Sequence, residues 1–287
     1  MSKPRILVQL DTDTQASVFD SVVAIDAGVA HLLRYADVRP SNVRERVHGA
    51  IFTRGADDLR HTALFVGGSD VAAGEDVLTE ILRSFLGPLR TSVMIDSAGA
   101  NTTAAAAVLA AARHINLDGA IALVLAATGP VGQRVVRLLA RHGATVRAGS
   151  RSQDRARAVC EAVAQRVEGA RLSAHETRDD EQTAATLQGV QVVFAAGAAG
   201  VELLSGATRS GAANLKVAID LNAVPPLGIA GLQVTDKAVE RDGVICYGAI
   251  GVGGTKMKIH RAAVQALFEN NHCVLDAEEI FEIGQKI

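Results

Sequence analysis

The residues best suited to binding a cofactor lie in a short glycine-containing loop, Ala127–Gly132. The loop reads Ala-Thr-Gly-Pro-Val-Gly, and it follows an all-apolar run, Ile121–Ala126, that is typical of a strand buried on both faces. An amphipathic helical pattern begins inside the loop. A strand, a glycine loop and a helix in this order are typical of a dinucleotide-binding unit, where free N–H groups at the helix N-terminus bind phosphate.

We therefore predict that a dinucleotide contacts the loop at Thr128, Gly129, Pro130, Val131 and Gly132. The first glycine of the G-x-G-x-x-G pattern is replaced by Ala127, so the backbone at this position must not need a positive φ. The alternative is a glycine-rich turn in a βα unit that binds no nucleotide.

The choice of dinucleotide depends on the end of the next predicted strand, about twenty residues further on. NAD enzymes place a carboxylate there, whereas this chain has Gly149-Ser150-Arg151-Ser152, with Arg155 one helical turn later. A guanidinium with hydroxyl groups beside it can bind the 2′-phosphate of NADP. We predict NADP as the cofactor and Ser150, Arg151, Ser152 and Arg155 as its contacts. The alternative for Arg151 is an ordinary solvated loop arginine.

Two later loops follow predicted strands of the same half. In doubly wound sheets, ligands bind outside the carboxyl ends of the strands. The small-residue loop Ala195–Gly200 should therefore face the cofactor through Ala196 and Gly197, and Asn222 could hydrogen-bond the nicotinamide side. Loops rich in Asx and proline are also often simple turns, which is the alternative for Asn222.

The elements that position these residues form an α/β pattern in both halves of the chain. The first hundred residues alternate strands with helices but lack a phosphate-binding glycine pattern; we expect strands at Arg5–Leu10, Thr62–Val66 and Thr91–Ile95 and helices at Val18–Ala30 and Val71–Phe85. After Ala120 we expect one parallel sheet, with strands at Ile121–Ala126, Thr145–Ala148, Gln191–Ala195, Leu215–Ile219 and Gly243–Cys246.

The fold class is therefore α/β, with two α/β domains and a cleft between them, the second domain being a Rossmann-type doubly wound parallel sheet. We place the first domain at residues 1–100, completed by a C-terminal helix at 274–287, and the second at residues 101–273. Asn101-Thr102-Thr103 opens the connecting helix, either as caps alone or also as part of a substrate site.

Composition narrows the class of partner. The 287 residues carry a net charge of −2, which gives neither the basic surface that binds nucleic acid nor a polybasic membrane patch. The apolar run at the N-terminus is too short for a signal peptide or a membrane span. Three widely spaced cysteines indicate reduced thiols in a cytoplasmic protein, and the eight histidines show no metal-binding spacing. We expect a small-molecule substrate and no metal.

With these residues in view, the chain resembles, nearly from end to end, the NADP-dependent methylene-tetrahydromethanopterin/methylene-tetrahydrofolate dehydrogenases of methylotrophic bacteria. The stretches that carry the resemblance are LDTDTQASVFD at 10–20, FVGGSDVAAGE at 65–75, DSAGANTTAAA at 96–106, ATGPVG at 127–132, NAVPPLGIAG at 222–231 and GAIGVGGTKMKIHRA at 248–262. Only the cofactor loop among them is generic.

The resemblance implies oxidation of the N5,N10-methylene group of a reduced pterin C1 carrier to the methenyl form, with NADP as the hydride acceptor. It also implies a pterin site in the cleft between the domains and a homo-oligomer, a trimer or a hexamer. Hydride loss from a carbon between two nitrogens leaves a cation that both nitrogens stabilise, so neither a metal nor a proton-transferring pair is required. The enzyme would act mainly by placing the reactants and excluding water.

Lys256 is the residue we expect to be catalytic. It follows the glycine-rich segment Gly251–Thr255, which we expect to open a helix over Met257–Phe268 and to present the lysine to the substrate. A cation beside the developing methenyl charge would hinder the reaction, so the expected contact is away from the reacting carbon. The alternative is a helix lysine that extends to solvent.

Substrate-binding candidates lie at the start of the chain and at the domain junction. Phe19 could cover the pterin ring, or it could be a core residue beside Val18. Asp96, and more weakly Asp20, could accept hydrogen bonds from the amino and ring N–H groups of the pterin, although Asp96 could instead cap the following turn. Asn101 and Thr102 complete the set.

Two other functions fit parts of the sequence. Shikimate-type and quinate-type NADP dehydrogenases share the two-domain plan, but they use a lysine in the N-terminal domain, and residues 1–100 contain lysine only at Lys3. A non-catalytic NADPH-sensing regulator would also bind the cofactor, but no partner-binding helix or DNA-binding element is evident in the sequence.

Overall fold

The computed structural model describes residues 3–287, and the chain divides into two compact units. Unit 1 extends up to Thr102 and resumes from Met257 to Ile287, and unit 2 is Thr103–Lys256. The chain passes between the units inside helix α4 (Ala100–Ala112) and again inside helix α9 (Ala249–Ala266). Residues 257–273 therefore belong to unit 1, whereas the sequence placed them in the second domain. The reason is that this part of α9 and the loop after it contact the first sheet, as His260 on the ring of Phe65 and Asn270 at Ser92 illustrate.

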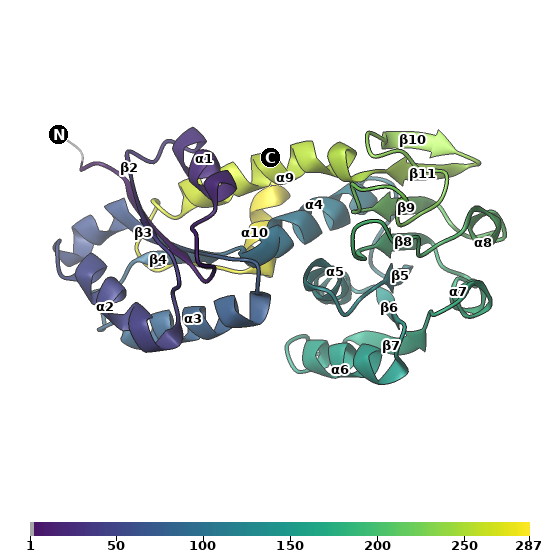
Figure 1. The fold of residues 1–287 in the computed structure, drawn as a ribbon, viewed down its shortest axis with the longest axis horizontal. Coiled ribbons are helices and arrows are strands. Elements are labelled where there is room, and N and C mark those ends of the chain that lie inside the picture. The colour runs from purple at the N-terminus through teal and green to yellow at the C-terminus, as the bar shows by residue number, and fades with distance from the viewer. Residues whose placement is uncertain (1–2) are drawn as a thin grey trace. The chain divides into compact units, whose positions relative to one another are not determined.

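Unit 1 is built on a five-stranded parallel sheet (Figure 1). Its order is β12-β4-β3-β1-β2, with β1 at Ile6–Asp11, β2 at His31–Tyr35, β3 at Thr62–Gly67, β4 at Ser92–Ile95 and β12 at Val274–Leu275. Its helices are α1 (Val18–Asp26), α2 (Pro40–Ile51), α3 (Val71–Ser84) and α10 (Ala277–Gly284), with short 3-10 turns at Ala56–His61 and Ser97–Gly99. The helix predicted at 274–287 thus begins only at Ala277, after a short strand.

Side-chain alternation along the strands of unit 1 separates two buried faces. One face packs against α2 and α3, which lie together below the sheet in Figure 1. Leu10, Leu64 and Val93 contribute to this face, and Val47 and Ile81 cover it from the helices. Phe65 and other strand residues of opposite parity point to the other face, where Phe65 meets α9.

Unit 2 is a seven-stranded sheet of order β10-β11-β9-β8-β5-β6-β7. The strands are β5 (Ile121–Leu125), β6 (Thr145–Ser150), β7 (Arg171–Glu176), β8 (Val192–Ala195), β9 (Val217–Asp220), β10 (Lys237–Arg241) and β11 (Val244–Tyr247). All pairs are parallel except β10 with β11. The chain winds outward from β5 to β7 and then returns to β8 on the other side of β5, so the doubly wound sheet predicted for this half is confirmed, with an antiparallel strand at one edge.

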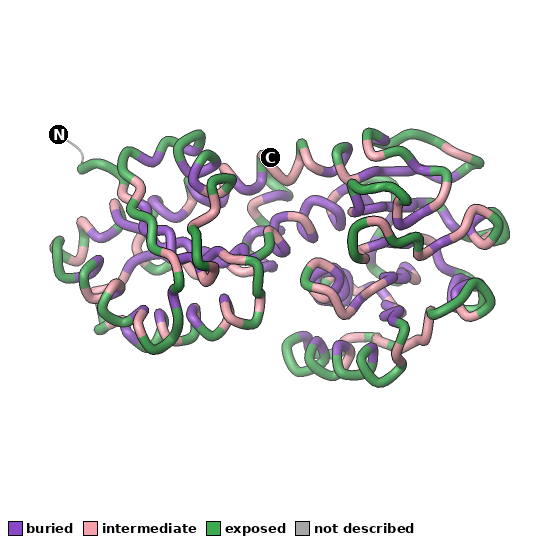
Figure 2. The backbone as a smooth tube through the Cα atoms, in the orientation of Figure 1, coloured by how far each residue is buried: buried purple, intermediate pink, exposed green. Residues whose placement is uncertain are grey.

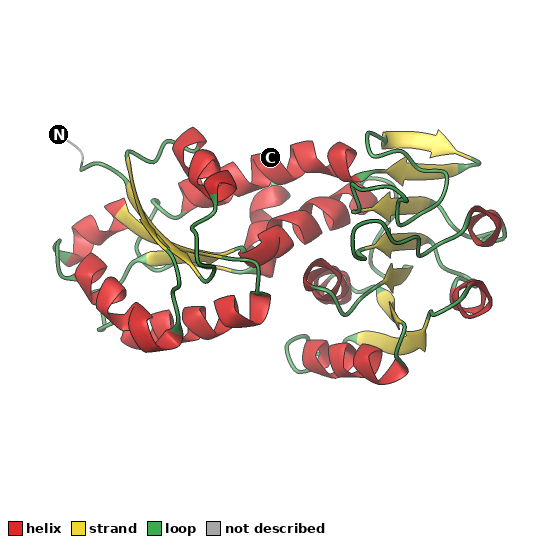
Figure 3. Ribbon diagram, in the orientation of Figure 1, coloured by secondary structure: helices red, strands yellow, loops and turns green. Residues whose placement is uncertain are grey.

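Helices cover both faces of this sheet (Figure 3). Within unit 2, α5 (Pro130–Arg141) and α6 (Gln153–Ala164) lie on one face, and α7 (Asp180–Thr186) and α8 (Gly206–Ser210) lie on the other. The central strands are buried along their whole length, as Figure 2 shows for β8 and β9. Burial on both faces explains why the sequence of these strands is continuously apolar rather than alternating.

Candidate functional site

The loop after β5 brings the chain into position for a dinucleotide. Gly129 is the N-cap of α5 and Pro130 is its first residue, so the N-terminus of the helix is formed inside the predicted loop. A Cβ on Gly132 would lie 2.6 Å from the carbonyl oxygen of Ala126 and 2.9 Å from the Cα of Ala127, so only glycine allows this close contact between helix and strand. The positive φ of this turn, 55°, is at Ala126 rather than at Ala127. Alanine at the first position of the pattern therefore carries no backbone strain.

A pocket of about 190 Å³ opens beside this loop at the carboxyl edge of the sheet in unit 2. Its walls come from the loops that follow β5, β6, β7 and β8. The lining residues are Ala126, Thr128, Ser150, Arg151, Arg155, Thr177, Gly197, Ala198, Val201 and Leu203. Five of them were predicted as cofactor contacts, namely Thr128, Ser150, Arg151, Arg155 and Gly197. None of the lining residues in the described chain is acidic, and two of them are arginines.

The other predicted cofactor residues lie near this pocket or serve the loops around it. Gly129 lies beside Ala196, whose carbonyl oxygen is 3.5 Å from the position of a Cβ on Gly129. Ser152 caps α6, and its hydroxyl accepts the backbone N–H of Arg155 at 3.5 Å. Asn222 accepts the N–H of Val224 at 2.9 Å and donates to the carbonyl of Pro226 at 3.2 Å. Asn222 is buried, so its side chain holds the turn, which was the alternative weighed for it.

Sequence reasoning missed the part of this pocket that follows β7. Thr177 lines the pocket, and its N–H donates to the carbonyl of Ser150 at 2.8 Å. β7 is an edge strand whose residues Arg171 and Ser173 are exposed and which has no apolar run, so no hydrophobic pattern predicted it. Val201 and Leu203 were missed because they lie just beyond the predicted small-residue loop.

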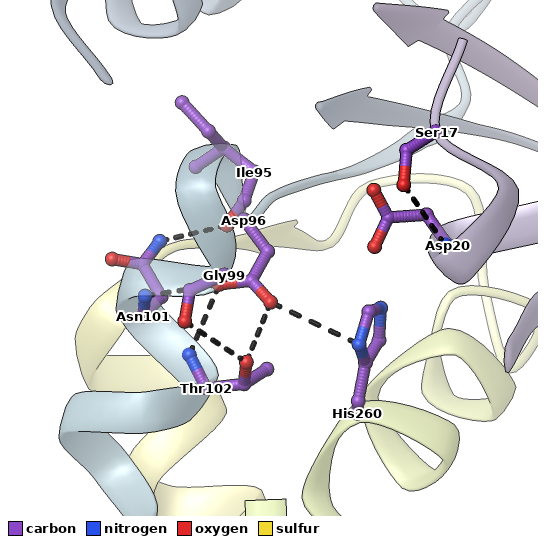
Figure 4. Close-up of polar contacts among 8 residues, drawn as sticks. All are labelled: Ser17, Asp20, Ile95, Asp96, Gly99, Asn101, Thr102 and His260. Atoms are coloured by element: carbon purple, nitrogen blue, oxygen red, sulfur yellow. Dashed lines mark hydrogen bonds and ion pairs between the residues drawn. The ribbon is translucent and has the colours of Figure 1, made fainter. Parts of the chain in front are cut away.

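In unit 1, the substrate candidates gather at the carboxyl edge of the sheet around Asp96 (Figure 4). One carboxylate oxygen of Asp96 accepts the backbone N–H groups of Asn101 at 2.9 Å and Thr102 at 3.0 Å. The other accepts the hydroxyl of Thr102 at 2.6 Å. Asp96 therefore caps the first turn of α4, and Asn101 and Thr102 are donors inside the helix rather than its caps. All three side chains are buried, with exposed fractions of 2 % or less.

His260 joins this cluster from α9, and sequence reasoning missed it. Its Nδ1 lies 3.9 Å from the carboxylate oxygen of Asp96 that binds Thr102, and its ring stacks on Phe65 with centroids 5.6 Å apart and planes 17° from parallel. The imidazole is 1 % exposed. One signal was available, because His260 lies inside the helix predicted over Met257–Phe268, close in sequence to the candidate Lys256.

Asp20 and Phe19 reach the same imidazole from the first turn of α1. The ring of Phe19 lies 6.3 Å from that of His260, and its residue is 50 % exposed, so Phe19 is not the core residue that the alternative supposed. Asp20 is half-buried, and its backbone N–H donates to the capping hydroxyl of Ser17 at 3.2 Å. Burial raises the pKa of the Asp20 carboxyl above its usual value, the charges of Asp96 and Asp11 raise it further, and His260 opposes the shift.

Lys256 lies in the second turn of α9 and is half-buried. The prediction that the glycine segment precedes the helix is wrong, because α9 begins at Ala249 and the segment is its first two turns. The physical reason is close packing. A Cβ on Gly248 would overlap the carbonyl oxygen of Gln233, and one on Gly251 would overlap that of Asp236, so these glycines let the helix approach a loop.

Two further observations concern residues 3–287 as a whole. No helix among them is long and apolar enough to cross a membrane. Within the same residues, no three His, Cys, Asp or Glu side chains are grouped as ligands of a metal ion would be.

Comparisons with known proteins agree with this geometry. The family model described as methylene-tetrahydromethanopterin dehydrogenase, N-terminal, matches residues 18–98, and the model of the NmrA-like family matches residues 119–214. The bifunctional protein MdtA of Methylorubrum extorquens is 45% identical over 289 residues, covering 100% of both chains. The chain belongs to the methylene-tetrahydromethanopterin dehydrogenase family. The resemblance found in the sequence and the prediction of an oxidoreductase are thus confirmed.

A second member of this family from the same organism is described as an NAD(P)-dependent methylenetetrahydromethanopterin dehydrogenase. It is 29% identical over 292 residues and covers 98% of both chains. Solved structures support the fold alone. A chorismate mutase/shikimate 5-dehydrogenase fusion protein from Clostridium acetobutylicum has a TM-score of 0.55 at 11% identity, over 99% of this chain and 97% of the other. Quinate dehydrogenase from Corynebacterium glutamicum has a TM-score of 0.53 at 14% identity, over 99% of each chain.

Proposed function

We propose that this enzyme transfers a hydride from the N5,N10-methylene group of a tetrahydromethanopterin C1 carrier to NADP⁺, giving the methenyl form, with methylene-tetrahydrofolate as the second candidate carrier. The observation that carries the cofactor choice is the pocket after β6, which Arg151 and Arg155 line and which has no carboxylate among its lining residues in the described part of the chain. The family membership carries the substrate class.

The residues of unit 2 fit NADP. Gly132 makes the close helix–strand contact that a dinucleotide loop requires, and the N-terminus of α5 offers its N–H groups to the pyrophosphate. Ser150, Arg151, Ser152 and Arg155 would hold the 2′-phosphate, while Thr128, Ala196 and Gly197 would line the path of the cofactor. When bound, NADP⁺ supplies the nicotinamide carbon that accepts the hydride.

The residues of unit 1 fit an orienting role toward the pterin. Asp96 already accepts three hydrogen bonds, so we assign it, with Asn101 and Thr102, to positioning the first turn of α4 and the imidazole of His260. Asp20 keeps a half-buried carboxylate and Phe19 an exposed ring face, which suit the N–H groups and the flat face of a pterin. Lys256, the last residue of unit 2, would contact the substrate away from the reacting carbon.

This arrangement needs no general base. Loss of hydride from the methylene carbon leaves a cation shared by the two neighbouring nitrogens, and no proton moves in that step. The side chains therefore act by binding, orienting and excluding water. Carboxylates near the pterin would favour the developing positive charge, in keeping with Asp20 and Asp96 at the same edge of the sheet.

The alternative, a shikimate-type or quinate-type dehydrogenase, would need a catalytic lysine in the first hundred residues. The only lysine there, Lys3, is ion-paired to Asp58 at 2.7 Å, in the turn that precedes β3 and hence at the amino edge of the sheet.

The purified enzyme should form NADPH with methylene-tetrahydromethanopterin, and methylene-tetrahydrofolate should be assayed beside it. Absence of NADPH with both carriers would refute the reaction, and shikimate oxidation would reverse the assignment. We also expect a cytoplasmic enzyme that assembles as a trimer or hexamer, which analytical ultracentrifugation would test.

Arg151→Asp tests the assignment of the 2′-phosphate site. Because a charge-assisted hydrogen bond contributes about 1.5–3 kcal/mol, its loss and reversal should weaken NADP⁺ binding by about tenfold or more, with a much smaller effect on NAD⁺. Arg157→Asp is the matched control, since Arg157 lies on α6, the helix that follows Arg151, with a 60% exposed side chain, and does not line the pocket. Titration calorimetry with both cofactors gives the ratio. An unchanged ratio in Arg151→Asp would remove Arg151 from the site.

A further inference from the structure

The carboxylate of Glu176 precedes a residue of the wall of the proposed 2′-phosphate site, and Arg178 is its ion-pair partner. Glu176 is the last residue of β7 and pairs in register with Ser150 of β6, which places it at the same edge of the sheet as Arg151. The guanidinium of Arg178 lies 2.5 Å from the carboxylate of Glu176. The Glu176 side chain is 30% exposed, so solvent screens it only in part.

Arg178 also contacts the backbone of the loop that follows β6. The same Nη2 donates to the carbonyl oxygen of Arg151 at 3.3 Å. Between Glu176 and Arg178, Thr177 lines the pocket itself, so both charged residues flank a residue of the pocket wall. The other acidic residues after β7 belong to the start of α7, where Asp179 is the N-cap and accepts the N–H of Gln182 at 2.9 Å.

A carboxylate in this neighbourhood works against NADP in two ways. It repels a 2′-phosphate, and it accepts the ribose hydroxyl groups of NAD when it is free to do so. An arginine in contact with it cancels its charge and occupies its oxygens. The Arg178–Arg151 contact adds a second effect, because it fixes the backbone from which the Arg151 guanidinium extends.

We propose that Arg178 is a specificity-determining residue that makes this site select NADP over NAD, by neutralising Glu176 and by holding the Arg151 loop. The proposal rests on the NADP preference proposed above and identifies a residue behind the direct phosphate contacts. Arg178 is a positioning residue, since it does not line the pocket.

A double-mutant cycle tests this role. Affinities for NADP⁺ and NAD⁺ are measured by calorimetry for the wild-type enzyme, Arg178→Ala, Glu176→Gln and the double variant. Since the pair is partly exposed, we expect Arg178→Ala to raise the Kd for NADP⁺ by about five- to tenfold at low salt and by less at about 0.5 M salt, with little change for NAD⁺. Glu176→Gln alone should bind NADP⁺ at least as tightly as the wild type, and in the double variant it should recover most of the loss.

The outcomes separate the proposal from its rivals. Equal weakening of both cofactors by Arg178→Ala, or no recovery in the double variant, would overturn it. Arg157→Ala, which removes another exposed arginine outside the pocket, is the control and should leave both affinities unchanged. A wild-type enzyme without NADP preference would refute the proposed cofactor instead, and loss of turnover with methylene-tetrahydromethanopterin at normal NADP⁺ affinity would refute only the proposed reaction.

Discussion

Among individual residues, Asp96 and Asp20 of unit 1 show how local geometry gives similar side chains different roles. Asp96 follows a strand directly, and the turn after it contains Ala98 with a φ of 54°, which folds the backbone so that α4 begins above the carboxylate. The oxygens of Asp96 therefore accept hydrogen bonds from the first turn of α4. Asp20 belongs to a helix turn capped by Ser17, so its own carboxylate is left facing His260 and Asp96. The difference depends on backbone conformation, which residue type and spacing do not specify.

Asp20→Asn should make the folded protein more stable at pH 7. The folded-state pKa of Asp20 is raised above its ordinary value of 3.8, mainly by burial, so the stability it contributes is full below that value and is lost as the pH rises through the folded pKa. An amide avoids this loss. The gain in the free energy of unfolding should shrink as the pH falls toward 3.8, measured by urea unfolding across pH. Asp26→Asn, at an exposed position of the same helix, is the control. A gain that does not depend on pH would contradict this assignment.

At the scale of elements, the strands that are buried on both faces could be predicted from the sequence, whereas strands at the edges of the sheets could not. The central strands β5, β8 and β9 were predicted because an all-apolar run has few other uses. The edge strands β2, β7 and β10 were missed, since they contain no buried residue and their mixed composition has no such pattern. For the same reason the loop after β5 could be assigned to the cofactor, while Thr177 and Arg178, which follow an edge strand, could not.

The start of α9 gives an element-scale prediction, because its glycines differ in their surroundings. Gly251→Ala would put a Cβ against the backbone carbonyl of Asp236, and such overpacking costs about 1–3 kcal/mol of stability. Gly254→Ala meets no atom within 4 Å and should stabilise the helix by about 0.5–1 kcal/mol. Urea midpoints should therefore move in opposite directions. If both variants unfold at a lower urea concentration than the wild type, the helix tolerates no alanine here for a reason other than close packing.

At the scale of the whole molecule, unit 1 is completed only by the end of the chain. β12 adds to β4 through Val274 opposite Val93 and Leu275 opposite Met94. Asn101 of α4 donates to the carboxylate of Asp276 at 3.0 Å, and Ser92 donates to the carbonyl of Asn270 at 3.0 Å. His260 comes from the same returning segment. Contacts across some 180 residues leave no local trace, which is why neither the place of His260 beside Asp96 nor the division inside α9 was predicted.

Removal of residues 270–287 should therefore unfold unit 1 and leave unit 2 folded. The deletion takes away β12 and the buried side chains of Leu275, Ile280 and Phe281, each contributing about 1.5–3 kcal/mol, which together approaches the whole stability of a domain. Hydrogen exchange should show loss of protection in β1, β3 and β4 and its retention in β5, β6 and β8. A chain ending at Gly284 is the control, because residues 285–287 are exposed. Since every proposed NADP contact lies in unit 2, the truncated chain should still bind NADP⁺, and loss of that binding would show that the cofactor unit does not fold without unit 1.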